Sequence, residues 1–276
     1  MSKAYIDVGL LVINSLKSII NDKTYLIPFV LPVIWLFVAF FHFWFLLGDL
    51  LVYFQNYQYI QNPSFFVNFF SKNLTTIALT VFFYGIIFFI LFVIAMSVVI
   101  KKYQFQRTGE KLEVGKAFFY VKKNLSRIFG TIILAGLILF LPILLVIPIF
   151  FGFFNNISLL VGISMLILII IIIPWVYISL RLALVLQTCV MEYLSPVENI
   201  KKCWGVTKGN VLNIFVVSLV IGLISSIFVI PFQIIGYAGF PIIQIIGLII
   251  IYLFTWPFSM VAMSALYYEI RFDSTN

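Results

Sequence analysis

The amino-acid sequence predicts an all-α polytopic membrane protein: a bundle of six transmembrane helices with amphipathic interfacial helices on its cytoplasmic side and an internal repeat. The chain of 276 residues is 64% hydrophobic and 9% charged, whereas a soluble domain is about 25% charged. Its apolar segments are long enough to cross a bilayer, which takes about 20 helical residues. Its basic residues collect in alternate loops. These observations assign residues 1–276 to one integral membrane domain.

Six segments are candidate transmembrane helices by length and hydropathy. They lie at about 25–47, 76–100, 128–152, 158–180, 211–235 and 242–266. None contains an acidic residue. Because a charge at mid-membrane is costly and persists where it has a use, proton relays and acid-dependent sodium transport are disfavoured. Passage of a neutral solute is not, since hydroxyls and backbone carbonyls can line such a path.

Lys and Arg residues set the predicted orientation. Eight of the 17 lie in 101–127, between the second and third spans, and of the others only Lys72 falls on the opposite side of the membrane. Since positively charged loops stay in the cytoplasm, a multi-pass protein of the plasma membrane with both termini cytoplasmic is predicted. The net charge of +8 then faces an anionic inner leaflet, and no nucleic-acid partner is expected.

Three amphipathic stretches on the predicted cytoplasmic side are interfacial helices. They lie at about 4–20, 112–126 and 196–208. In the second, apolar residues recur at helical spacing while Lys116, Lys123 and Arg127 share another face. The third begins with a capping box, Ser195 to Glu198, with proline at the first helical position, and should stop at Gly209.

The order of amphipathic stretch, short polar hinge and span predicts a repeated unit. Its clearer copies lie at 114–139 and 196–225, and both enter their spans through a Gly-Leu-Ile core. A fainter copy precedes the first span, and three units would account for six spans as three pairs. The later outer linkers have about six residues and the inner ones about 20 to 27, a contrast that favours repeats over ordinary basic linkers.

A motif follows the fourth span: Arg181-Leu182, then Glu192, then the segment 195–209, SPVENIKKCWGVTKG. Its end resembles a Lys-x-x-Trp-x-x-Thr-x-Gly pattern found in uncharacterised prokaryotic six-span membrane proteins. These include the membrane domain attached to some glycerophosphodiester phosphodiesterases. The resemblance implies the six-span architecture. It does not imply the activity, because those enzymes carry a separate barrel with acidic metal ligands and a catalytic His pair, and this chain has one His.

Arg181, at the cytoplasmic end of the fourth span, is the central candidate binding residue. If the helix continues, Glu192 falls on nearly the same face. With Lys201, Lys202 and Trp204, Arg181 is a candidate site for an anionic headgroup or an acidic solute. The alternative is an arginine that reaches the interface and pairs locally to set the depth of its helix. The remaining members of the candidate lipid- or anion-binding set are Lys116, Lys123 and Arg127.

Small residues on the fifth span form a predicted packing face. Ser218, Gly222 and Ser226 recur at spacings of four, which suits close helix packing or an oligomer contact. Cys189 and Cys203 are expected to be reduced packing residues. The sequence contains no catalytic motif and no Cys/His cluster, so no catalytic residue, metal or cofactor is predicted, and the protein is not expected to be an enzyme.

Two functions remain open on these grounds. The first is a non-catalytic integral membrane protein, an accessory or scaffold element that contacts anionic membrane lipids, with a protein partner or a homo-oligomer possible. The alternative is a permease or channel for a small neutral or anionic solute. That alternative requires a continuous polar path through the bundle.

Overall fold

The computed structural model describes residues 6–46, 63–110, 113–140, 158–239 and 241–272, and every regular element in these ranges is helical. The elements are α1 (Val8–Asn21), the short 3-10 helix η1 (Lys23–Tyr25), α2 (Ile27–Leu46), α4 (Pro63–Arg107), α5 (Val114–Lys123), α6 (Leu125–Phe140), α8 (Ser158–Leu182), α9 (Val185–Glu192), α10 (Pro196–Val206), α11 (Val211–Tyr237) and α12 (Pro241–Arg271).

Proline and glycine explain several helix ends. The helices α4, α10 and α12 each begin at a proline, whose missing N–H is one that the first turn leaves unpaired in any case. Gly109 and Gly209, just beyond α4 and α10, have φ of 82° and 84°, the left-handed conformation that commonly ends a helix. At the start of α10, the Glu198 carboxylate accepts a hydrogen bond from the Ser195 N–H at 3.1 Å, as the capping box predicts, and another from the Ser195 hydroxyl at 2.7 Å.

Four described helical segments are long and apolar enough to cross a membrane, which confirms a membrane protein. They are Lys72–Arg107, Ile170–Glu192, Val211–Tyr237 and Ile242–Arg271. A fifth span results if α5 and α6, bent by 70° at their junction, count as one. The apolar part of α2, Ile27–Phe43, is shorter. The predicted third span, 128–152, extends past the described residues, so the total of six spans stays a prediction.

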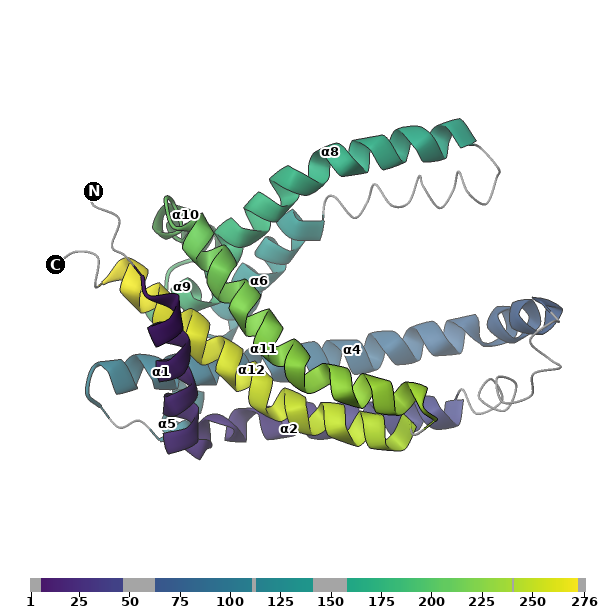
Figure 1. The fold of residues 1–276 in the computed structure, drawn as a ribbon, viewed down its shortest axis with the longest axis horizontal. Helices are drawn as coiled ribbons and strands as arrows, with labels where there is room; N and C mark the ends of the chain where they lie inside the picture. Colours follow the sequence, from purple (N-terminus) through teal and green to yellow (C-terminus); the bar gives the residue numbers. More distant parts are fainter. Residues whose placement is uncertain (1–5, 47–62, 111–112, 141–157, 240, 273–276) are drawn as a thin grey trace.

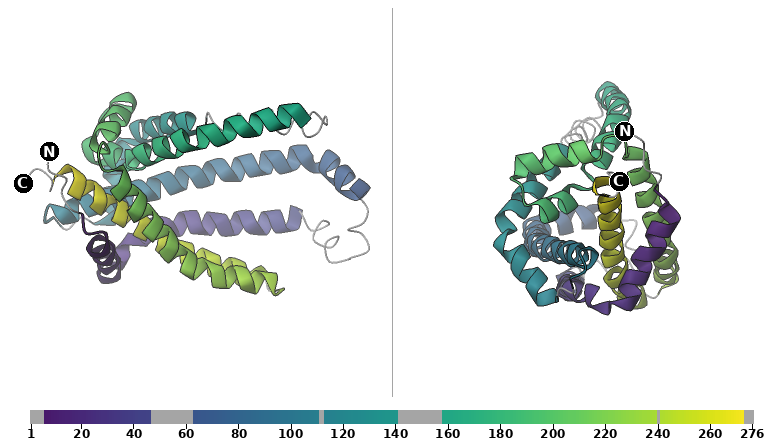
Figure 2. Two further views of the ribbon diagram at one scale, coloured as in Figure 1. Left: turned by 45° about the horizontal axis from the view of Figure 1, so that its top comes forward. Right: turned by 90° about the vertical axis from the view of Figure 1, so that its left-hand side faces the viewer.

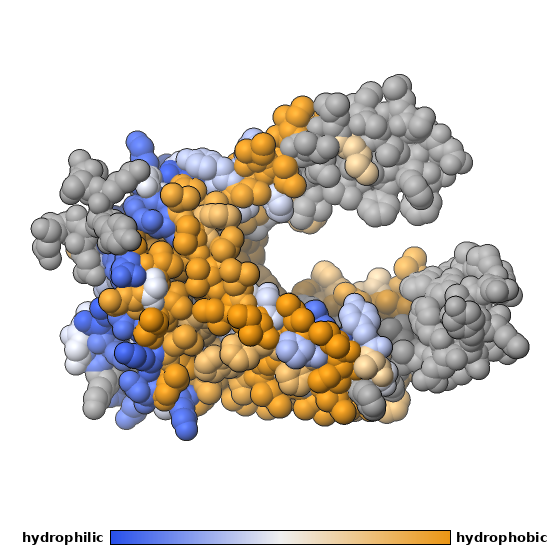
Figure 3. All heavy atoms as spheres, in the orientation of Figure 1, coloured by the Kyte–Doolittle hydropathy of each residue, from blue (hydrophilic) through white to orange (hydrophobic). Residues whose placement is uncertain are grey.

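The long helices converge at one end (Figures 1 and 2) and form two arms in the view of Figure 1. One arm contains α2, α4, α11 and α12, with α11 packed along α12, and the other contains α6 and α8. Large apolar side chains such as Phe82, Ile173 and Leu223 are exposed along the arms. Figure 3 shows this apolar surface and the hydrophilic surface gathered at the junction of the arms.

The buried core lies at this junction, which we call the polar end and define by α1, α5, α9, α10 and the C-terminal half of α12. Its centre is α9, where Leu186 to Met191 are all buried and which contacts α4, α6, α10 and α12. The start of α1 and the end of α12 lie at the same end (Figure 1). The structure forms α1, α5 and α10 where the three amphipathic helices are predicted, and their position in a membrane interface stays a prediction.

The second predicted span, 76–100, lies inside a longer helix. The helix α4 continues from Pro63 to Arg107, beyond the predicted limits of 76–100, and it carries Lys101 and Lys102 into the buried core. The predicted span ends before these two lysines, because an ammonium group exposed to lipid is unfavourable. In the fold they are partnered within the protein, so the helix does not need to end there.

The predicted packing face on α11 is not used within the described chain. Gly222 and Ser226 are exposed, and a Cβ built on Gly222 has no neighbour within 4 Å. The helices α11 and α12 approach closely instead at Gly247, where a Cβ would lie 1.9 Å from Cδ1 of Phe232, and at Gly236, where it would lie 1.9 Å from Oε1 of Gln244. An oligomer contact through Ser218, Gly222 and Ser226 stays a prediction.

Candidate functional site

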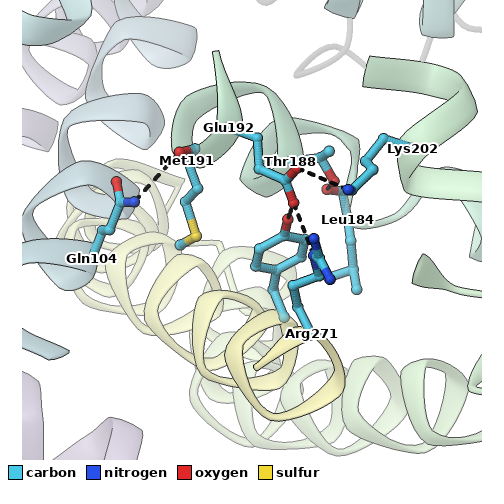
Figure 4. Close-up of polar contacts among 8 residues, drawn as sticks. Gln104, Leu184, Thr188, Met191, Glu192, Lys202 and Arg271 are labelled. Carbon is cyan, nitrogen blue, oxygen red and sulfur yellow. Dashed lines mark hydrogen bonds and ion pairs between the residues drawn. The ribbon is translucent and has the colours of Figure 1, made fainter. Parts of the chain in front are cut away.

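Glu192, the last residue of α9, connects three helices at the polar end. Its carboxylate accepts a hydrogen bond from the Tyr267 hydroxyl and lies 3.3 Å from both the Lys202 Nζ and the Arg271 Nε (Figure 4). The Glu192 side chain is 17% exposed. Because Lys202 belongs to α10 while Tyr267 and Arg271 belong to α12, one carboxylate ties α9 to both helices. On the other side of α9, the Gln104 amide of α4 donates to the Met191 carbonyl.

Arg181 ties the end of α8 to α10. Its Nη2 donates to the Trp204 carbonyl at 2.5 Å, and its guanidinium carbon lies 4.5 Å from the centre of a Trp204 ring. The Arg181 carbonyl in turn accepts from the Cys203 thiol at 3.2 Å and the Thr207 hydroxyl at 3.1 Å. Contacts to both the side chain and the main chain of Arg181 fix α10 against the end of α8.

The shared face of Arg181 and Glu192 was predicted for a continuous helix, and this condition is not met, because α8 ends at Leu182 and α9 begins at Val185. Arg181 is 3% exposed, and it makes no ion pair with any carboxylate in the described part of the chain. Its Nε is buried without a hydrogen-bond partner there. The positive charge is stabilised by a carbonyl oxygen and by aromatic faces.

Two adjacent lysines of α4 make their contacts inside the fold. Lys102 Nζ lies 2.5 Å from the Asp22 carboxylate and 4.3 Å from the centre of the Tyr25 ring. Burial raises the Asp22 pKa, but hydrogen bonds from Lys102 and Thr24 and the Lys102 charge lower it further, so the net pKa is below its ordinary value. Lys101 donates to the Gln104 side chain at 2.7 Å.

Aromatic rings surround the Lys101 ammonium. It lies 4.5 Å from the centre of the Tyr193 ring and 4.9 Å from that of Phe105. Tyr193 ends α9 in the left-handed conformation, φ 54°, the only described non-glycine residue with positive φ. Its carbonyl accepts from Arg127 of α6 at 3.0 Å. Arg127 therefore serves an internal contact in addition to its predicted role in lipid or anion binding.

The seven predicted lipid- or anion-binding residues thus divide into two groups. Arg181, Trp204, Lys202 and Arg127 make contacts inside the polar end, although Trp204 stays 39% exposed. The others, Lys116, Lys123 and Lys201, are exposed and form no ion pair with the described residues. The sequence prediction placed Lys202 with Lys201 on the polar side of one amphipathic helix, and it missed the role of Tyr267 and Arg271, which lie far along the chain.

A cavity of about 310 Å³ lies between α4, α9, α11 and α12. Its polar lining consists of Gln187, Ser218 and Ser259, and three methionines from two helices form much of the rest. The remaining lining residues are aliphatic. Over the described residues, no group of three or more His, Cys, Asp or Glu side chains is placed to hold a metal ion.

Cys203 is expected to resist alkylation in the folded protein. Burial raises the pKa of its thiol to about 12, and only the thiolate reacts. At pH 8, iodoacetamide should therefore modify Cys203 about a thousandfold more slowly in the folded chain than in the denatured chain. Peptide mapping after timed alkylation measures this ratio. Rapid modification in the folded state would contradict the buried position of Cys203.

Comparison with known proteins gives a family but no activity. A family model described as a domain of unknown function, DUF7847, matches residues 46–268. No curated protein and no solved structure matches the chain. None of these findings links the chain to glycerophosphodiester phosphodiesterases, so that resemblance stays a prediction.

Proposed function

The chain belongs to the DUF7847 family, a domain of unknown function, and we propose that it is a non-catalytic membrane protein whose polar end contacts anionic lipid headgroups. In this proposal it acts as an accessory or scaffold element of the plasma membrane. Six spans in three repeated pairs and cytoplasmic termini belong to the proposal. The orientation rests on the positive-inside rule, with Lys72 as the one basic residue on the outer side.

The observation that carries the proposal is the exposure of unpaired lysines beside apolar arms. Lys116 and Lys123 on α5 and Lys201 on α10 are exposed at the polar end, whereas the buried cations there have partners inside the protein. A basic residue near an anionic surface gains about 1 kcal/mol. Three such residues, placed where the apolar surface ends, suit a layer of phosphate headgroups.

Replacing Lys116, Lys123 and Lys201 by glutamine is expected to reduce the enrichment of anionic lipid around the protein several-fold. Each lysine contributes about 1 kcal/mol, which is about a fivefold preference for anionic lipid at its own position, and the internal ion pairs are not touched. The measurement is the ratio of phosphatidylglycerol to phosphatidylcholine that co-purifies with the full chain from vesicles containing both lipids, at low and at high salt.

The matched control is Lys72→Gln, which removes an exposed lysine at the far end of α4. This variant should retain as much phosphatidylglycerol as the native chain does. If the triple variant retains phosphatidylglycerol as well as the Lys72→Gln variant does, the lipid-contact proposal is rejected. Lys202 and Arg127 are left unchanged because their loss would also disturb contacts within the fold.

The cavity favours a second candidate function, a permease or channel for a small neutral solute. A path for such a solute needs polar groups along its length, and Gln187, Ser218 and Ser259 supply them at one level of the bundle. Osmotic swelling of proteoliposomes in glycerol measures this activity. Swelling no faster than that of protein-free vesicles would remove this candidate.

A further inference from the structure

The helix α1 has a second apolar face that stays exposed in the described part of the chain. Its first face packs on α11 and α12, and the residues buried there are Leu11, Val12, Ser15 and Ile19. Ile13 and Ile20 lie on another side and are 53% and 62% exposed, with the partly exposed Leu16 beside them. Polar residues form the third face: Asn14, Lys17 and Asn21. An amphipathic helix on a soluble protein needs only one apolar face.

The helices α5 and α10 also carry exposed apolar side chains beside a buried face. The buried residues are Ala117 and Val121 in α5, and Asn199 and Cys203 in α10. In α5, Phe118 and Phe119 are 48% and 68% exposed. In α10, Val197 and Trp204 are 53% and 39% exposed. Apolar side chains exposed in groups mark an interaction surface.

The exposed apolar faces of α1, α5 and α10 have the same position relative to the buried face. At about 100° of rotation per residue, each lies roughly a third of a turn from the centre of the buried face, in the direction in which the chain winds. Two exposed residues depart from this order: Leu10 lies on the polar side of α1, and Lys122 lies between the two phenylalanines of α5. The shared order favours one common environment for the three helices.

The surroundings of these faces indicate lipid. The helices that follow α1 and α10 begin with exposed apolar residues, since Ile27 of α2 is 53% and Leu212 of α11 is 72% exposed. The apolar faces therefore continue toward the apolar surface of the arms. Exposed lysines follow each apolar face on its polar side: Lys17, Lys123 and Lys208. Lysines beside exposed apolar side chains are typical of a helix that lies in a membrane interface.

The placement of the three helices favours a lipid layer over a single protein partner. The helix α1 lies across the long helices (Figure 1), and α5 meets α6 at 70°. They pack on different parts of the bundle, α1 on α11 and α12, α5 on α4, and α10 on α6 and α9. One protein partner would cover one of these faces, whereas a lipid layer surrounds the whole bundle.

We infer that α1, α5 and α10 lie in the headgroup layer and insert their exposed apolar faces among the acyl chains of the adjacent leaflet. The flanking lysines then reach the phosphates, as long basic side chains do at an interface. This inference deepens the proposed lipid contact and rests on it for the position of the polar end at the membrane surface. It adds an apolar contact that requires no anionic lipid.

The test uses the full chain in phosphatidylcholine nanodiscs, with single cysteines introduced at exposed positions and converted to nitroxide spin labels. Both native cysteines are buried, and the unsubstituted chain treated with the same reagent gives the background. Collision with oxygen reports contact with acyl chains, and collision with a nickel chelate reports contact with water. The oxygen-to-nickel collision ratio should be several-fold higher for Ile13→Cys than for the adjacent Asn14→Cys. Ile20→Cys should exceed Asn21→Cys in the same way.

Matched pairs on the other two helices test whether the environment is shared. On α5, the ratio for Phe118→Cys should exceed that for Lys123→Cys. On α10, the ratio for Val197→Cys should exceed that for Gly205→Cys. All four positions are exposed, so the labels replace no residue of the buried core. Protection of Cys203 from alkylation verifies that each variant is folded.

Two results would overturn the inference. Equal ratios within the pairs would place the apolar faces in water. Low collision rates with both reagents at Ile13→Cys and Phe118→Cys would show that protein covers these faces, and dipolar broadening between labels would identify that protein as a second copy of the chain. Because these nanodiscs contain no anionic lipid, the outcome is independent of the phosphatidylglycerol ratio measured for the lysine variants, and failure of one proposal is distinguishable from failure of the other.

Discussion

Glu192→Gln is expected to destabilise the protein by about 1–3 kcal/mol. The substitution keeps the shape of the side chain but removes the charge that lies 3.3 Å from the Lys202 Nζ and the Arg271 Nε. The side chains of both cations are about a third exposed, 35% and 37%, and solvent screening reduces the loss below that of a fully buried pair. Unfolding by sodium dodecyl sulfate in mixed micelles, followed through Cys203 alkylation, measures the change.

The control for Glu192 is Glu113→Gln. Glu113 is an exposed carboxylate that precedes α5 and forms no capping hydrogen bond there, so its loss should change stability little. A double-mutant cycle with Arg271→Gln isolates the contribution of one pair. Equal stabilities for Glu192→Gln and Glu113→Gln would show that the carboxylate does not hold α9 to α10 and α12.

Gly247→Ala is expected to destabilise the packing of α11 on α12 by about 1–3 kcal/mol. The added Cβ would lie 1.9 Å from Cδ1 and 2.1 Å from Cε1 of Phe232, so the ring must move or the helices must separate. Overpacked cores respond by straining side chains or shifting the backbone. The same detergent unfolding measurement should show a lower midpoint for Gly247→Ala.

Gly85→Ala is the matched control, because a Cβ on Gly85 of α4 has no neighbour within 4 Å. In a helix that is exposed at this position, alanine is favoured over glycine, so Gly85→Ala should be neutral or slightly stabilising. Combining Gly247→Ala with Phe232→Ala should recover part of the loss by making room for the new methyl group. A midpoint for Gly247→Ala equal to that of Gly85→Ala would contradict the close approach.

The sequence predicted those features of the polar end that depend on interactions within one or two helical turns. The start of α10 follows from Ser195, Pro196 and Glu198 because a capping box and an N-terminal proline act within one turn. Its end follows from Gly209 for the same reason. Long apolar helices follow from composition and length, since the bilayer demands both.

Partners far apart in the chain carry no such local signal. Glu192 and Tyr267 are 75 residues apart and Lys102 and Thr24 are 78 apart, and nothing in either local pattern identifies the other member. The break between α8 and α9 also escaped prediction, because the segment stays apolar through it. Gly247 on α12 was missed for a related reason. Small residues on α11 recur at the spacing expected of a packing face, whereas Gly247 is a single glycine whose contact, the Phe232 ring, lies on another helix.

The separation of Glu192 from its partners has a consequence for biogenesis. In the two-stage model, membrane helices insert first and associate afterwards, and synthesis proceeds from the N-terminus. When α9 has been made, the Tyr267 hydroxyl and the Arg271 guanidinium do not yet exist, since they follow 75 and 79 residues later. Until α12 is inserted, the described residues offer Glu192 a single charged partner, Lys202 of α10, so the contacts that hold α9 in place are completed only when α12 arrives.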